Sequence, residues 1–249
     1  MLLPALTAIA ALLFAALLVD QYRQRRHPYQ LAWALGATAF ALAAAAETLA
    51  SAVGWSEPLY RLWYISGAVW TAGWLGAGTI LLLTKTRFGY WYALCLALAG
   101  LFTVLVARRL EDPSAGPTAL LYALATWCAS TAIGWLTYLG DHRWSRVAVG
   151  FTALLSVLAL PLLVRATLPA PGWAVNSTTG APVALLLPPA LRLLTPLLNI
   201  SGALALVTGA LFSIYVFMPK QRTLPYSRDR KSTRLNSSHV SESRMPSSA

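Results

Sequence analysis

The chain has 249 residues, of which 57% are hydrophobic and only 11% are charged, and its formal net charge is +11. Water-soluble domains carry about 25% charged residues, so this composition excludes an ordinary soluble fold. The positive charge is scattered over short connectors and forms no single basic patch. No nucleic-acid partner is therefore expected.

Seven apolar stretches follow one another along the chain, each near the roughly 20 residues that a helix needs to cross a bilayer. Backbone polar groups in lipid must be paired within their own segment, so stretches of this length form helices. The sequence predicts an all-α fold, a polytopic membrane bundle of seven transmembrane helices within residues 1–226. The stretches are 2–19, 30–53, 60–83, 88–107, 117–139, 147–167 and 194–218.

The first stretch is predicted to be a retained helix rather than a cleaved signal. No basic residue precedes it, no small-residue cleavage site follows it, and three arginines come after it.

The connectors alternate in their number of basic residues, and Lys and Arg accumulate on the cytoplasmic side of membranes. One side holds ten basic residues: Arg23, Arg25, Arg26, Lys85, Arg87, Arg143, Arg146, Lys220, Arg222 and Arg228. The other holds five: Arg61, Arg108, Arg109, Arg165 and Arg192.

This asymmetry predicts an N-terminus outside and a seventh helix that ends in the cytoplasm. The bias toward Ala, Leu and Arg is typical of bacteria. The expected location is thus the bacterial inner membrane, with the protein as a multi-pass component.

Glu47 is the ionisable residue that most needs an explanation, because it lies about two turns inside the outer end of the second helix. A carboxylate in hydrocarbon normally faces a partner or a wet cavity. Arg61, at the outer start of the third helix, is the nearest candidate partner. One hypothesis is a salt bridge that holds these helices together, and the other is a carboxylate that binds a ligand or carries a proton.

Tyr60 and Tyr64 lie one helical turn apart, so both hydroxyls are expected on one face of the third helix. They fit an ordinary aromatic belt at the membrane surface, and they equally fit a binding site in which Tyr64 points toward Glu47. Spacing alone does not separate these interpretations.

Small residues at four-residue spacing mark the second, third and seventh helices, and such spacing lets helix backbones approach closely. These three helices are expected to form the tight centre of the bundle. The long outer connector, about 168–192, is rich in proline around the apolar run 183–187, and we interpret it as a surface segment or lid.

Asn199, near the outer end of the seventh helix, is expected at about the depth of Glu47. The predicted ligand-binding residues are therefore Glu47, Arg61, Tyr64 and Asn199, placed beneath the lid.

The tail after Pro225 changes abruptly to a polar sequence, and a disordered segment is expected over 227–249. Residues 229–249 resemble the translated read-through of a sequencing adapter. On this interpretation the natural C-terminus is missing, and any cytoplasmic signalling domain beyond about Tyr226 would be lost with it.

The sequence lacks the residues that several kinds of cofactor and metal chemistry require. The histidines are His27, His142 and His239, none within a predicted helix, so a haem or a histidine-held metal is not expected. The seventh helix has no lysine for a retinal Schiff base, and the two cysteines lack C-x-x-C spacing. No catalytic residues, metal or cofactor are therefore predicted, and an enzyme is the least favoured class.

Five strings resemble a family of uncharacterised seven-helix proteins of high-GC bacteria. They occupy residues 31–36, 45–49, 60–64, 75–79 and 199–213. The family resemblance implies no activity. The layout, with a glutamate late in the second helix, is also loosely similar to the seven-helix sensor regions of bacterial histidine kinases.

The leading functional hypothesis is a sensory or binding module that accepts a small amphiphilic ligand in its outer half. A small permease or proton-coupled carrier that uses Glu47 is the first alternative. A structural subunit of a membrane complex is the second.

Overall fold

A computed structural model describes residues 2–110, 112–168, 174–175, 182–183 and 187–221 of the chain. Contacts divide the chain into two compact units, Met1–Gly209 and Ala210–Ala249. The helix packing reported below belongs to the first unit. The predicted tail, 227–249, lies outside the described residues.

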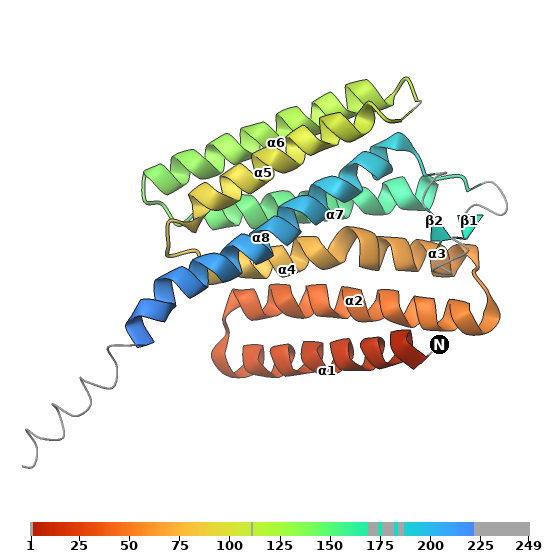
Figure 1. Cartoon of the computed structure of the whole chain (residues 1–249), viewed down its shortest axis with the longest axis horizontal. Coiled ribbons are helices and arrows are strands. Elements are labelled where there is room, and N and C mark those ends of the chain that lie inside the picture. The colour runs from red at the N-terminus through yellow and green to blue at the C-terminus, as the bar shows by residue number, and fades with distance from the viewer. Residues whose placement is uncertain (1, 111, 169–173, 176–181, 184–186, 222–249) are drawn as a thin grey trace, which may run out of the picture. The chain divides into compact units, whose positions relative to one another are not determined.

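The described residues are almost entirely helical, which confirms the prediction of an all-α fold (Figure 1). Within the part of the chain that the structure describes, seven helices are long and apolar enough to cross a membrane. The third of these spans combines α3, the π-helical segment η1 and α4. The helices are α1 (Leu2–Arg25), α2 (Pro28–Val53), α3 (Glu57–Trp63), η1 (Tyr64–Trp70), α4 (Thr71–Leu82), α5 (Phe88–Ala107), α6 (Ala115–Tyr138), α7 (Trp144–Arg165) and α8 (Pro189–Gln221).

The connector between α7 and α8 contains one short strand pair that the sequence did not predict. Strand β1 (Ala174–Val175) pairs antiparallel with β2 (Pro182–Val183), and Ala174 lies opposite Val183. Most of the residues proposed as a surface segment or lid, including 184–186, lie outside the described residues. The structure therefore leaves the lid as a prediction.

Several helices that are neighbours in the chain pack side by side. Helix α1 packs on α2, α2 on η1 and α4, and α5 on α6, while α7 contacts both α4 and α6 (Figure 1). Short connectors favour this arrangement because they bring the end of one helix next to the start of the following helix.

Small residues bring the third span against α2 and α8, as the four-residue spacing predicts. A Cβ atom added at Gly76 would lie 2.7 Å from the Cα of Gly202 on α8. One added at Gly36 on α2 would lie 2.8 Å from the Cγ of Leu75. The backbones meet so closely that larger side chains would force the helices apart.

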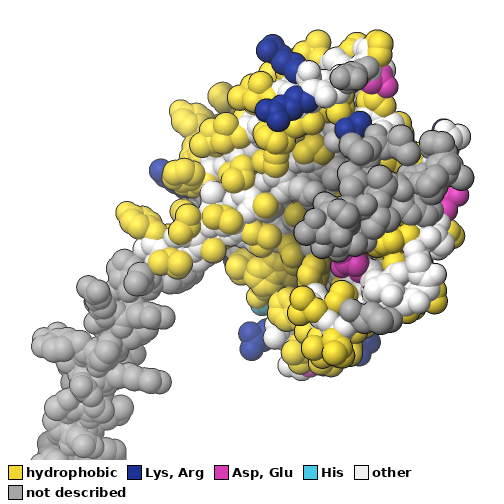
Figure 2. Space-filling view, turned by 45° about the vertical axis from the view of Figure 1, so that its right-hand side comes forward, with side chains coloured by type: hydrophobic (Ala, Val, Ile, Leu, Met, Phe, Trp, Pro, Cys, Tyr) yellow, Lys and Arg dark blue, Asp and Glu magenta, His cyan; other side chains and the backbone are white. Residues whose placement is uncertain are grey.

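Large apolar side chains cover much of the outer surface of the helices, including Leu13 (62% exposed) on α1 and Leu121 (65%) on α6. The face drawn in Figure 2 is correspondingly hydrophobic. A soluble monomer rarely exposes continuous apolar surface of this extent. Together with the seven long apolar helices, this surface identifies a multi-pass membrane protein.

Candidate functional site

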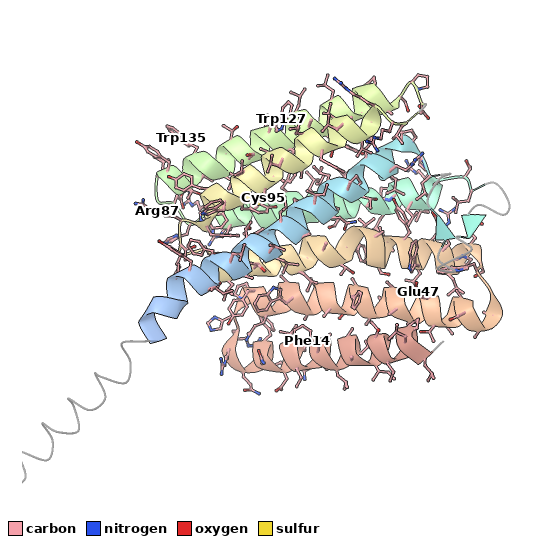
Figure 3. All side chains as sticks on the ribbon, in the orientation of Figure 1. Phe14, Glu47, Arg87, Cys95, Trp127 and Trp135 are labelled. Carbon is pink, nitrogen blue, oxygen red and sulfur yellow. The ribbon has the colours of Figure 1, made fainter. Side chains whose placement is uncertain are left out.

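Glu47 lies on α2, about two turns before the helix ends at Val53, and it faces a cavity of about 400 Å³. Figure 3 labels this residue in the part of α2 nearest the connector to α3. The cavity has walls from α1, α2 and the third span. It is lined by Leu3, Pro4, Thr7, Phe40, Ala43, Ala44, Glu47, Trp63, Gly67, Ala68 and Thr71.

Glu47 is the one ionisable side chain among these lining residues. The two lining hydroxyls are satisfied within their own helices, because Thr7 Oγ1 donates to the carbonyl oxygen of Leu3 (2.9 Å) and Thr71 Oγ1 to that of Ser66 (2.8 Å). Among the described residues, none forms a hydrogen bond or ion pair with the Glu47 carboxylate. The cavity thus combines an acidic group with largely apolar walls.

The π-helical segment forms part of this cavity wall. Segment η1 spans Tyr64–Trp70, and Thr71 donates its backbone N–H to the carbonyl of Ser66, five residues earlier. A π-helical turn is wider than an α-helical turn and occurs frequently at functional sites. The sequence does not indicate this segment, because Gly67 fits the pattern of an ordinary packing glycine equally well.

Gly67 also sets how close α2 lies to the cavity. A Cβ atom at this position would lie 2.8 Å from the Cβ of Ala43, closer than two carbon atoms normally approach. Because glycine has no side chain here, α2 and the π-helical segment pack tightly beside Glu47. The rigid contact fixes one wall of the cavity.

Arg61 does not pair with Glu47, so the predicted salt bridge is wrong. Its guanidinium instead binds Glu57, one turn earlier on the same helix, with an Nη2–Oε1 distance of 2.5 Å. It also donates to the carbonyl oxygens of Leu163 and, at 2.7 Å, Ala166. These contacts place Arg61 at the C-terminal end of α7, where helix carbonyls lack partners within the helix.

Tyr64 points toward α8 rather than toward Glu47. Its hydroxyl lies 2.8 Å from Thr195 Oγ1, and the side chain is buried. Thr195 Oγ1 in turn donates to the carbonyl of Leu191, so Tyr64 is the donor in this pair. The hydroxyl therefore links the third span to the last helix.

Asn199 lies on α8, one turn beyond Thr195, and is half-buried. In the described part of the structure, Arg61, Tyr64 and Asn199 do not line the cavity that contains Glu47. Of the four predicted site residues, Glu47 lines this cavity, Arg61 and Tyr64 join helices, and Asn199 lies on α8 outside the cavity. Glu47 alone keeps the surroundings of a binding residue.

In the described part of the chain, no group of three or more His, Cys, Asp or Glu side chains is placed to hold a metal ion. Cys95 is buried and Cys128 is exposed, and both are free thiols.

Comparisons with protein-family models, curated proteins and solved structures give no match. Any functional conclusion must come from the chemistry of the cavities.

Proposed function

We propose that this protein is a binding or sensory module of a bacterial inner membrane, and that its ligand is a small amphiphile with a cationic or hydrogen-bond-donating head group. The Glu47 cavity is the observation that supports this function. Its volume of about 400 Å³ falls within the range of sites for small ligands.

The lining selects the ligand chemistry. A carboxylate in a largely apolar enclosure favours a positively charged or donating partner, because bonds that involve a charged group are stronger than neutral ones. The walls of Leu3, Phe40, Ala44 and Trp63 favour an alkyl or aromatic body. An amphiphile satisfies both parts of the cavity at once.

A proton-coupled carrier is the second candidate, because Glu47 is an intramembrane carboxylate beside an open space. A carrier must expose its site to both sides of the membrane in turn. The lining residues extend from the start of α1 to the middle of α2 and of the third span, so the cavity occupies one half of the length of these helices (Figure 1). That one-sided position favours binding over transport.

The substitution Glu47→Gln tests the binding function. The probe is decyltrimethylammonium, with decyl sulfate as the anionic comparison, added to the full chain in phosphatidylcholine nanodiscs. We expect the cation to raise the thermal unfolding midpoint of the wild type. In Glu47→Gln its affinity should fall about 10- to 100-fold, because the attraction between the carboxylate and the quaternary ammonium charge is lost.

Glu57→Gln is the matched control, since it removes the same charge from a carboxylate that is paired with Arg61 and lies outside the cavity. Each variant is compared with its own ligand-free midpoint. Equal affinity for the cation in Glu47→Gln and the wild type would exclude Glu47 as the binding group.

A further inference from the structure

Two adjoining cavities lie at the end of the bundle opposite to the Glu47 cavity. Their volumes are about 490 and 750 Å³, and both are lined by Lys85, Gly140 and His142. The connectors α1–α2, α4–α5 and α6–α7 meet there, since the larger cavity is also lined by His27 and Arg143. Neither cavity shares a lining residue with that of Glu47.

Basic side chains dominate the charge of this paired cavity. Lys85 and Arg87 line the smaller part, and Lys85, Arg143 and Arg146 line the larger. Asp141 is the one acidic lining residue; it lies 3.8 Å from the Nε atom of Arg143 and accepts the backbone N–H of the same residue. Within the described chain, Lys85, Arg87 and Arg146 have no carboxylate partner, so the cavity carries net positive charge.

Helix N-termini add to this charge. Helices α2, α5 and α7 begin at Pro28, Phe88 and Trp144, and residues from the first turn of each line the two cavities. The residues that precede them, His27, Arg87 and Arg143, give no side-chain capping bond. Some of the first N–H groups are already bonded, since Phe88 donates to Thr86 Oγ1 and Trp144 to the carbonyl of Asp141. The contribution of these helix starts to anion binding is therefore mainly their partial positive charge.

Aromatic side chains place the site at the membrane surface. Tyr90 (43% exposed) and Tyr138 (71% exposed) line the smaller cavity, and Trp144 is buried behind them with its indole N–H donated to the carbonyl of Thr84 at 3.2 Å. Tyrosine and tryptophan concentrate at the depth of lipid head groups. Basic pockets between helices at this depth suit lipid phosphates.

We propose that these two cavities form a binding site for a phosphate-bearing anion. The source is either the head group of an anionic membrane lipid or a soluble phosphate. Lys85 and Arg87 supply the unpaired positive charges in the smaller cavity, and the starts of α5 and α7 supply the dipoles. The site is independent of Glu47, so either proposal can fail without the other.

Binding measurements on the full chain in phosphatidylcholine nanodiscs test the site. The probes are dioctanoyl phosphatidylglycerol, dioctanoyl phosphatidylcholine and inorganic phosphate, and the readout is saturable thermal stabilisation. The variant Lys85→Ala/Arg87→Ala should bind the effective probe about 10- to 30-fold more weakly, because two charge contacts are lost.

Two further variants test whether the loss of binding depends on the position of these charges. Arg108→Ala/Arg109→Ala removes the same charge from exposed residues that line neither cavity, and it should bind like the wild type. Lys85→Arg/Arg87→Lys keeps the charge and should also retain binding.

Stabilisation by phosphatidylglycerol alone would support a lipid phosphate, and equal stabilisation by inorganic phosphate would support a soluble source. Failure of both probes to stabilise the wild type beyond phosphatidylcholine would overturn the site. So would an equal loss of affinity in the two alanine double variants, because net charge alone would then explain the binding.

Discussion

At the scale of single residues, Arg61 joins two helices through its planar guanidinium. The side chain is 21% exposed, pairs with Glu57 and donates to the last carbonyl groups of α7. The ends of helices leave such carbonyls without partners, and basic side chains satisfy them. Arg61 therefore stabilises the contact between the third span and α7.

The substitution Arg61→Ala should lower the free energy of unfolding by about 1–3 kcal/mol, because charge-assisted bonds to carbonyl groups are lost. Thermal or denaturant unfolding of the detergent-solubilised chain measures this change. Arg165→Ala, at the exposed last turn of α7, is the matched control and should change stability by less than about 0.5 kcal/mol. Equal effects of both substitutions would show that Arg61 acts only through surface charge.

The sequence singled out Glu47 for a physical reason, since an ionisable group inside an apolar stretch must face something polar or open. Its predicted partner was wrong because Glu57 offers Arg61 a carboxylate one helical turn away. Such a pair on one helix forms without any rearrangement between helices. The direction of Tyr64 was likewise unpredictable, because helical spacing does not show which neighbouring helix a face meets.

The lengths of the apolar stretches predicted the seven long apolar helices of the described residues. The fourth stretch, 88–107, coincides with α5, whereas α1 continues from the predicted end at residue 19 to Arg25. A helix can continue beyond the apolar stretch into polar residues, and the hydropathy of the sequence does not show where it then ends. The ends of helices that continue into polar residues were therefore predicted less accurately than their apolar interiors.

The π-helical segment η1 shows where sequence patterns stop being informative. Seven residues from Tyr64 to Trp70 shift the register of the third span without a proline or a run of glycines to mark them. The sequence of these residues is equally compatible with an ordinary α-helix. Only packing against Ala43 of α2, at a position where Gly67 has no side chain, relates this segment to the cavity.

The two proposed sites lie at opposite ends of the helices in the first unit. The Glu47 cavity adjoins the start of α1, and the basic cavities adjoin the start of α2 (Figure 1). Basic connectors favour the cytoplasmic side. We accordingly propose that the Glu47 cavity belongs to the outer half of the membrane.

Cysteine labelling tests this orientation in a Cys95→Ala/Cys128→Ala background. A membrane-impermeant maleimide added to intact cells should label a Ser56→Cys variant, in the exposed connector after α2. A Gln24→Cys variant, at the exposed end of α1, should react only after the cells are permeabilised. The reverse pattern would place the N-terminus in the cytoplasm.

The most direct measurement is modification of Glu47 by dicyclohexylcarbodiimide, an apolar reagent that reaches carboxyl groups from within the membrane. Peptide mass spectrometry of the treated chain in nanodiscs locates the N-acylurea product. We expect modification at Glu47 but not at the ion-paired Glu57, and we expect saturating decyltrimethylammonium to slow it about tenfold or more. An unreactive Glu47, or the same rate with and without the amphiphile, would contradict a ligand-binding cavity at this residue.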